Sequence, residues 1–351
     1  MVAQLRLKHT AVKAIYSVIP KMVYKTIDYP YFSEDEAKMF ANTTGIIERR
    51  VAATNVTASD MCFKAAQTLL EDMNCHHEID LLVFVTQSPD YFLPASAAIL
   101  QDKLGLPKTC MAFDVNLGCS GYVHGLLLAN RYLQQGGLRK VLLLAGDKST
   151  ISTHEQDKTA FPLFGDAGSA TLLEYDAKGK DWFFDAGTDG SGANAIIIEA
   201  GHSRMPYQSF DDQDIEVAPG VVRSKKHLAI DGMAVFNFAL KNVPKSINNV
   251  LDLAKIRTEQ LDYLVLHQAN QLITDSIRKK MNLPKEKCPS SIGDFGNTSS
   301  ASIPLTLCSE LSEALKKERL SLLLCGFGVG FSWASLLLST HNVATKLLEY
   351  D

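Results

Sequence analysis

Short apolar runs alternate along the chain with segments in which apolar residues recur at a helical period. Four runs are apolar at nearly every position and predict buried strands at residues 79–86, 140–145, 261–266 and 320–325. Such runs are typical of a sheet that helices cover on both faces. The helical period predicts helices at residues 60–73, 121–135, 234–256, 271–282 and 302–316. Because strands and helices alternate, the pattern indicates an α/β fold.

The pattern also repeats once within the chain. The predicted strands IDLLVFVTQ and LDYLVLHQA align so that Asp80 matches Asp262, 182 residues later. The strands that end in VLLLAG and LLLLCG align so that Gly146 matches Gly326, 180 residues later. Two matches in order at nearly the same offset indicate that each half is a copy of one α/β unit.

The repeat predicts two halves, residues 1–176 and 177–351. The polar segment DAKGKD at residues 176–181 supplies a turn between them. Residues 201–226 are polar, contain two prolines and one Pro-Gly pair, and follow no clear period. We therefore expect a surface loop there.

Composition narrows the class of protein. Hydrophobic residues make up 46% and charged residues 21% of the 351 residues, as in ordinary soluble proteins. The net charge of -4 does not support a nucleic-acid-binding protein. Lysines interrupt the apolar residues at the N-terminus, and no run is long enough for a membrane span. The seven cysteines form no CxxC pair, which argues against a zinc ribbon or a disulfide framework and predicts a reduced, cytoplasmic protein without a metal.

One cysteine stands where a strand becomes a helix. In FDVNLGCSGYVHGLLLANRYL (residues 113–133), a strand ends near residue 115 and the helical period begins at residue 121. Cys119 therefore lies at a helix entrance, where unpaired N–H groups and the helix dipole favour a thiolate. This position makes Cys119 a candidate nucleophile. A small residue buried in the core is the alternative interpretation.

Two further polar residues follow strands or precede helices. His267, in HQAN, follows the strand LDYLVL, and the carboxyl ends of strands are where α/β proteins build their sites. Asn297, in GDFGNTSSAS, precedes a helix. Taken singly, the two residues could cap helices or form turns. The repeat, however, places Cys119 and Asn297 at equivalent junctions of the two halves, beside the strand that ends at His267.

Other motifs are absent or incomplete. GFGVGF (326–331) lacks the GxGxxG spacing and leads into a strand-like run, whereas a dinucleotide-binding loop leads into a helix. The pair His154-Glu155 lacks the second histidine of HExxH. Neither GxSxG nor GxxxxGK[ST] occurs.

The ordered set of Cys119, HQAN and GNTS resembles the β-ketoacyl-[acyl-carrier-protein] synthase III family of the thiolase superfamily. The resemblance runs nearly from end to end, through TTGIIERRVA (43–52), FGDAGSATLLE (164–174), DGMAVFNFAL (231–240), HQAN (267–270), GNTSSASIP (296–304) and GFGVGFSW (326–333). It implies a thiolase-like, five-layered αβαβα fold with two similar halves and a homodimer. It implies no cofactor.

The resemblance also implies a mechanism. Cys119 would take an acyl group from a thioester. His267 and Asn297 would bind the carbonyl of a malonyl carrier and stabilise the enolate that forms as carbon dioxide leaves. The backbone N–H groups of Cys119 and Val329 would hold the acyl oxyanion, although the family usually has glycine throughout this loop and Val329 interrupts it.

Three positions depart from members of the family that use acetyl-CoA. Those members carry a tryptophan and an arginine that sandwich the adenine and a second arginine beside the TGI motif. Here the corresponding residues are Met39, Ser152 and Thr43. Without a flat stacking face and two cations, ordinary CoA binding is disfavoured. We therefore expect a specialised relative, primed by another acyl-CoA or by an acyl-carrier protein, and both primary fatty-acid synthesis and a specialised pathway stay open.

The partner surfaces follow from the same resemblance. Arg278, Lys279 and Lys280, on the helix after HQAN, could bind an acidic carrier protein or could simply form a solvated helix face. Leu93, in DYFLPAS, falls where the family's acyl pocket meets the dimer partner.

Two other functions compete with condensation. An acyltransferase of the same fold would use Cys119 to move an acyl group to oxygen or nitrogen without decarboxylation. A non-catalytic scaffold would be expected to lack Cys119, His267 or Asn297, and the chain retains all three.

Overall fold

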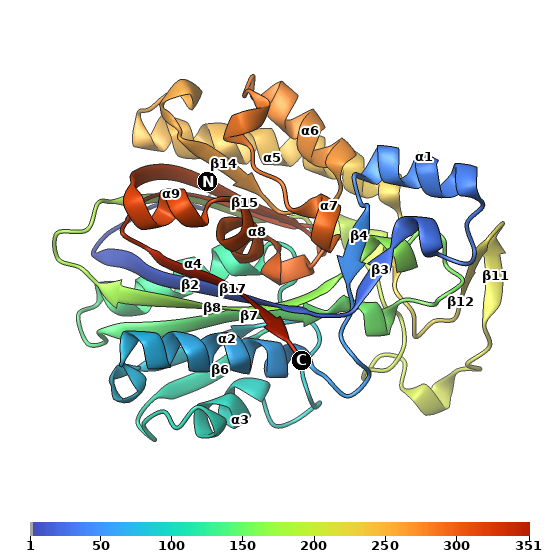
Figure 1. Cartoon of the computed structure of the whole chain (residues 1–351), viewed down its shortest axis with the longest axis horizontal. Helices are drawn as coiled ribbons and strands as arrows, with labels where there is room; N and C mark the ends of the chain where they lie inside the picture. Colours follow the sequence, from blue (N-terminus) through green and yellow to red (C-terminus); the bar gives the residue numbers. More distant parts are fainter. Residues whose placement is uncertain (1–2) are drawn as a thin grey trace.

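Two β-sheets lie at the centre of the computed structural model, which describes residues 3–351 (Figure 1). One sheet has six strands in the order β17 (Ala344–Tyr350), β2 (Thr10–Pro20), β8 (Asp166–Tyr175), β7 (Lys140–Lys148), β5 (Leu81–Val85) and β6 (Met111–Val115). The other has five, in the order β1 (Ala3–Leu7), β9 (Trp182–Thr188), β16 (Ser332–His341), β15 (Arg319–Gly328) and β14 (Tyr263–Leu266).

Helices fill the space between the sheets and cover both outer faces. The central layer consists of α4 (Gly121–Gln134), α8 (Ser302–Glu310) and α9 (Ser312–Lys317), whose apolar side chains join one core with both sheets. One outer face packs against α2 (Ala58–Met73) and α3 (Ser96–Lys103), and the other against α5 (Gly232–Ala254) and α6 (Gln271–Lys280). Figure 1 shows these two outer layers on opposite sides of the molecule. The five-layered αβαβα fold is confirmed.

The alternation of side chains along β5 explains why its sequence is apolar throughout. Leu81, Val83 and Val85 belong to the central core, whereas Leu82 and Phe84 pack with α2 and α3. Successive side chains of a strand point to opposite faces, so a strand covered on both sides has no polar face.

The smaller elements gather near one end of the sheets, on the right of Figure 1. They are α1 (Glu34–Thr44), α7 (Ile292–Phe295), and the strand pairs β3–β4 (Val23–Lys25, Glu48–Arg50), β10–β13 (Ile196–Ile197, Ala229–Ile230) and β11–β12 (Ile215–Ala218, Val221–Arg223).

The internal repeat is visible in matching contacts. The carboxylate of Asp80, just before β5, accepts hydrogen bonds from the N–H groups of Arg139 and Lys140 at the start of β7. The carboxylate of Asp262, just before β14, accepts one from Ser321 near the start of β15. Both pairs of strands are parallel, so each aspartate joins the beginnings of two neighbouring strands.

The first and last strands of the chain each pair with a strand of the other half. β1 pairs with β9 in the five-stranded sheet, and β17 pairs with β2 in the six-stranded sheet. Residues 176–181 connect β8 of one sheet with β9 of the other. The division at residues 176 and 177 stays a prediction, and each predicted half contributes one strand to the other half's sheet.

The predicted strands are all present, and most predicted helices match. The helix predicted at residues 302–316 is wrong in one respect, because Leu311 leaves the helical conformation and separates α8 from α9. The break lets α9 lie along β17, where Ser312 Oγ is 2.7 Å from Thr345 Oγ1 and Val343 N–H donates to the Leu315 carbonyl.

The loop predicted at residues 201–226 contains regular structure. Residues 215–223 form the β11–β12 hairpin, whose turn includes Gly220 at φ 71°. The Pro219-Gly220 pair between the apolar segments IEVA and VVR is the signal that could have predicted it, because glycine adopts positive φ without strain.

Candidate active site

Cys119, His267 and Asn297 line one cavity of about 170 Å³. Cys119 lies between β6 and α4, His267 directly follows β14, and Asn297 lies between α7 and α8. The rest of the wall is mainly aliphatic and aromatic, and includes Phe327. Segments far apart in sequence therefore bring the three predicted residues together.

The end of β15 packs directly onto Cys119. A Cβ atom on Gly328 would lie 2.7 Å from Cys119 Cβ and 2.8 Å from its Sγ. A Cβ atom on Gly326 would lie 2.7 Å from the Cys119 carbonyl oxygen. Only glycine permits this approach of two backbones. Ser332 Oγ holds the loop that follows β15, because it donates to the Val329 carbonyl and lies 2.7 Å from Ser120 Oγ.

Burial acts against the thiolate that the helix entrance favours at Cys119. Burial, followed by the nearby Asp147 carboxyl, raises the pKa of the Cys119 thiol to about 11. The Ser299 side chain and the N–H groups of Val329 and Cys119 act in the opposite direction but do not compensate. The helix entrance stabilises a negative charge on the sulfur, but the loss of water around the sulfur destabilises the thiolate by a larger amount.

This protonation state can be measured. The rate of Cys119 alkylation by iodoacetamide is expected to rise about tenfold per pH unit between about pH 7 and pH 10, because the reactive thiolate stays a minor species below its pKa of about 11. Intact-mass analysis after short pulses measures the rate. A Cys119→Ala variant corrects for reaction at Cys288, the other partly exposed cysteine. A plateau below pH 8 would contradict a protonated thiol.

His267 is a buried, neutral imidazole. Its side chain is almost fully enclosed, and burial lowers its pKa to about 3. Nδ1 lies 2.7 Å from Ser302 Oγ, and that hydroxyl also accepts the N–H of Gln268. The backbone of Ser299 also hydrogen-bonds the ring and acts against the effect of burial on its pKa. Phe327 packs edge-on against the ring with centroids 5.6 Å apart.

Asn297 has its amide group oriented by the backbone. Its Oδ1 accepts the N–H of Ser299 at 2.9 Å, which assigns Nδ2 as the free end of the amide. Nδ2 makes one long contact of 3.5 Å with the Ala269 carbonyl. The Asn297 N–H group donates to the Leu163 carbonyl, and the Asn297 carbonyl accepts the Gly165 N–H group. These hydrogen bonds hold the backbone from which the side chain projects.

The resulting arrangement combines one nucleophile with two neutral hydrogen-bond donors. The imidazole of His267 and the Nδ2–H group of Asn297 belong to side chains that line the same cavity as Cys119. Donors that are oriented before a reaction stabilise an oxygen on which negative charge develops. The site can therefore support acyl transfer to sulfur and formation of an enolate.

The sequence did not identify Asp147 or Ser302. Asp147 is buried beside the cavity, and its carboxyl accepts hydrogen bonds from the N–H groups of Gln87 and Ser300. Burial raises its pKa. The residue joins the ends of β5 and β7 to the turn before α8. An acidic residue at the end of an apolar strand was the available signal.

The remaining predicted residues lie elsewhere or act through the backbone. Val329 lines the cavity. Leu93 lies on an exposed loop and does not line it. Arg278, Lys279 and Lys280 lie on the last turn of α6, outside the cavity.

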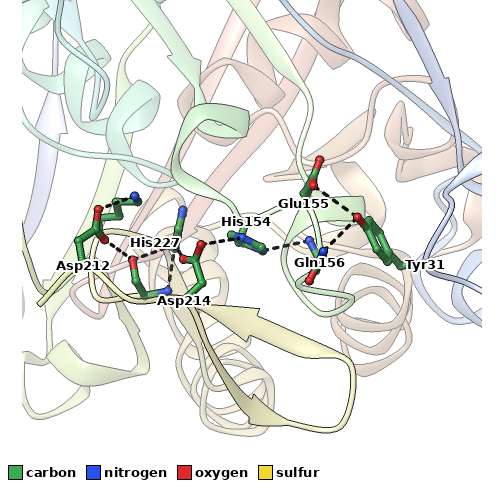
Figure 2. Close-up of polar contacts among 9 residues, drawn as sticks. Tyr31, His154, Glu155, Gln156, Asp212, Asp214 and His227 are labelled. Carbon is green, nitrogen blue, oxygen red and sulfur yellow. Dashed lines mark hydrogen bonds and ion pairs between the residues drawn. The ribbon is translucent and has the colours of Figure 1, made fainter.

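A long connecting segment of the chain borders the cavity. Residues 198–228, which we call the strap, connect β10 to β13. The strap is joined to residues 149–158 by the Leu228 N–H, which donates to the Ser152 carbonyl at 2.6 Å. His154 Nε2 is 3.3 Å from the Asp214 carboxylate, which lies near His227 as well (Figure 2). Ile198, Leu228 and Ser152 all line the cavity, so these contacts hold its wall in place.

Metal and membrane signals are missing from residues 3–351. No group of three or more metal-ligating side chains in this range is arranged to hold an ion. No helix within it combines the length and apolar character needed to cross a bilayer.

Comparison with known proteins assigns the fold and motifs to one family. Residues 113–190 match 3-oxoacyl-[acyl-carrier-protein (ACP)] synthase III, and residues 251–340 match the C-terminal part of that family. The chain is 32% identical over 351 residues to a β-ketoacyl-[acyl-carrier-protein] synthase III of Rhodopirellula baltica, covering 94% of this chain and 98% of that protein. It is 33% identical over 322 residues to one of Oceanobacillus iheyensis, covering 91% and 95%. The crystal structure of a 3-oxoacyl-(acyl-carrier protein) synthase from Burkholderia xenovorans LB400 has a TM-score of 0.94, with 36% identity and 99% of both chains covered.

Proposed function

Since this chain belongs to the 3-oxoacyl-[acyl-carrier-protein] synthase III family, we propose that Cys119, His267 and Asn297 perform a decarboxylative Claisen condensation. The protein is a condensing acyltransferase. Its substrates are an acyl thioester and a malonyl thioester, and its product is a β-ketoacyl thioester.

The first step transfers the acyl group to Cys119. The sulfur attacks the thioester carbonyl, and the new carbon–sulfur bond forms as the bond to the carrier sulfur breaks. The proton of the Cys119 thiol passes to the departing sulfur, which leaves as a thiol. This exchange suits a nucleophile that rests as a thiol, because the leaving group needs the same proton.

The backbone N–H groups of Cys119 and Val329 hold the oxyanion of this step. Both N–H groups form hydrogen bonds with the Cys119 sulfur that lower the pKa of the thiol. Ser332 fixes the Val329 peptide through the Val329 carbonyl. A side chain on Val329 leaves the N–H group intact, so the interruption of the glycine loop does not remove the donor.

The second step removes carbon dioxide from the malonyl thioester. His267 and Asn297 donate hydrogen bonds to its carbonyl oxygen, which gains charge as the carbon–carbon bond to the carboxylate breaks. The resulting carbanion attacks the acyl-cysteine, and the Cys119 sulfur leaves and takes up a proton. A neutral His267 is suited to this role because it donates a hydrogen bond without titrating near neutral pH.

One observation carries the proposal. The two side-chain donors have their opposite atoms occupied, His267 Nδ1 by Ser302 and Asn297 Oδ1 by Ser299, while both residues line the cavity of Cys119. The arrangement supports stabilisation of an enolate more directly than a simple transfer to oxygen or nitrogen, which would need a base for the acceptor.

The release of carbon dioxide separates condensation from acyl transfer alone. We expect a malonyl-carrier protein and a primer thioester to yield carbon dioxide and a β-ketoacyl product in equal amounts. Trapping of carbon dioxide together with mass analysis of the carrier measures both. Acyl transfer to an oxygen or nitrogen acceptor without carbon dioxide would contradict the condensation.

A homodimer is the proposed assembly. β6 forms one edge of the six-stranded sheet, and its first residue, Met111, is exposed. Tyr91, Phe92 and Leu93 form an exposed apolar loop after β5. Open strand edges and apolar loops are features that a second chain can cover. In such a dimer, Leu93 would reach the partner's acyl pocket.

The carrier protein is proposed to dock near α6. Arg278 pairs with Asp275, and Lys280 donates to the Leu240 carbonyl. Lys279 is exposed and lies two turns from Leu272 on the same face of the helix. We assign the attraction of the acidic carrier mainly to Lys279.

A further inference from the structure

The entrance of the cavity is bordered by exposed aliphatic side chains. Ile198 lines the cavity, and Ile151, Met233 and Leu272 each stand next to a lining residue in sequence. Their exposed fractions lie between 42% and 69%. We call these four residues the apolar rim. They come from four separate segments, each of which contributes at least one residue to the cavity wall.

The cavity wall offers no available cation. Asp147 and Lys148 are the charged residues that line it within the described chain. Lys148 is buried, and its Nζ donates to the carbonyls of Ala53, Thr54 and Val56. A lysine with these partners cannot reach a phosphate without leaving three carbonyls unsatisfied.

Three cations of the neighbouring segments are paired with carboxylates, whereas Arg204 and Lys225 of the strap are exposed and form no ion pair among the described residues. Three pairs have these contacts: Lys158–Glu36 at 2.8 Å, Arg223–Asp157 at 3.3 Å and Lys226–Asp212 at 2.6 Å. Asp214 and Glu155 add negative charge along the contact between the strap and residues 149–158 (Figure 2). The electrostatic environment beside the rim does not attract an anion.

The helices that begin beside the cavity each have one N-terminal N–H group capped by a side chain. α5 starts at Gly232, and the Asp231 carboxylate accepts the Ala234 N–H at 2.9 Å. α6 starts at Gln271, and Asn270 Oδ1 accepts the Ile273 N–H at 2.9 Å. A helix N-terminus binds phosphate through such N–H groups. Here a side chain occupies one in each helix, and at α5 that side chain is negatively charged.

These observations bear on the carrier of the acyl group. A CoA thioester and an acyl-carrier-protein thioester share the phosphopantetheine arm, but CoA adds an adenosine with a further phosphate. Those additional phosphates need cations or free N–H groups, and adenine needs a flat face. A carrier protein needs neither, because a protein surface can cover an aliphatic rim.

We propose that this enzyme takes its primer from an acyl-carrier protein and gains no binding energy from the nucleotide of CoA. The inference rests on the proposed function, since it concerns the donor in the first step. The carrier covers the apolar rim, and Lys279 faces its acidic surface. Cys119 Sγ replaces the pantetheine sulfur at the acyl carbon, and the carrier leaves with a free thiol that holds the proton from Cys119.

The test compares one acyl group on three donors. Butyryl-CoA, butyryl-pantetheine and butyryl groups on a purified bacterial acyl-carrier protein are each mixed with the full chain, and the series is repeated with acetyl and hexanoyl groups. Intact-mass analysis gives kcat/KM for acylation of Cys119. We expect the CoA and pantetheine thioesters to agree within about threefold, and the carrier protein to exceed both by about tenfold or more.

The outcomes distinguish the inference from the proposed function. An advantage of CoA over pantetheine of about tenfold or more would overturn the inference and leave the proposed function intact. A carrier protein that reacts no faster than pantetheine would overturn it as well. Failure of every donor to acylate Cys119 would overturn the proposed function itself.

A gain of charge at the rim supplies a second test. Leu272→Arg is expected to raise the ratio of kcat/KM for butyryl-CoA over butyryl-pantetheine about fivefold at low salt, and salt should reduce the gain. Leu347→Arg is the matched control, because Leu347 is exposed on β17 and does not line the cavity. An unchanged ratio in Leu272→Arg would contradict the inference that the CoA nucleotide contributes no binding energy because cations are missing at the rim.

Discussion

Replacement of Cys119 by alanine is expected to lower the rate of condensation by about 10⁴-fold or more. The variant lacks the sulfur that carries the acyl group between the two half-reactions. No other described residue that lines the cavity is a cysteine. Intact-mass analysis should detect no acyl adduct on this variant after exposure to a primer thioester that labels the native protein.

The decarboxylation of the malonyl thioester should survive this substitution in part. His267 and Asn297 stay in place, because the side chain removed is small and Gly328 packs against the same Cβ atom that alanine retains. Carbon dioxide without condensation product is therefore the expected result. It also demonstrates that the variant is folded.

Cys288→Ala is the matched control for the nucleophile. Five of the seven cysteines are buried, and Cys288 is the one besides Cys119 that is partly exposed. It does not line the cavity, so its loss should leave the acyl adduct and the condensation rate unchanged. An adduct that persists in Cys119→Ala and disappears in Cys288→Ala would assign the nucleophile to Cys288.

Replacement of His267 or Asn297 by alanine is expected to slow the release of carbon dioxide by about 10²–10³-fold in each case, which is the usual effect of losing one oxyanion donor. Acylation of Cys119 should change much less, because the backbone of Cys119 and Val329 holds the oxyanion of that step. The double variant should lose less than the product of the two effects, since both donors act on one oxygen.

The acyl adduct serves as the folding control for these variants, and Asn242→Ala is a matched substitution outside the cavity. Asn242 donates to the Phe238 carbonyl within α5. The pH dependence gives a further check. Because burial lowers the pKa of His267 to about 3, decarboxylation should show no inflection near the ordinary histidine pKa of about 6.5. Equal loss of acylation and decarboxylation would contradict separate roles.

The sequence predicted the fold because its evidence is local and repeated. β5, β7, β14 and β15 are apolar on both faces, and this pattern depends only on which residues neighbour one another along a strand. The helix break at Leu311 could not be predicted in this way. It depends on contacts with β17, which is formed by the last residues of the chain.

The sequence likewise predicted some features of the candidate site and not others. The motif around Cys119 predicted a residue at a helix entrance, and Ser120 and Gly121 form that entrance. The family resemblance suggested His267 and Asn297. No sequence pattern predicted that Ser302 would hydrogen-bond His267 Nδ1, or that Asp147 would lie beside the thiol.

The sequence by itself therefore predicted the α/β class, four of the central strands and three polar residues at the ends of elements, and the family resemblance supplied the five-layered class. The tertiary structure decided the chemical states of these residues. Burial of Cys119, against which the end of β15 packs from about 200 residues away in sequence, raises the pKa of its thiol. Lys158, beside the entrance, is held by the carboxylate of Glu36 from a distant segment. Periodicity depends on neighbours in the chain, whereas pKa values, tautomers and free charges depend on neighbours in space.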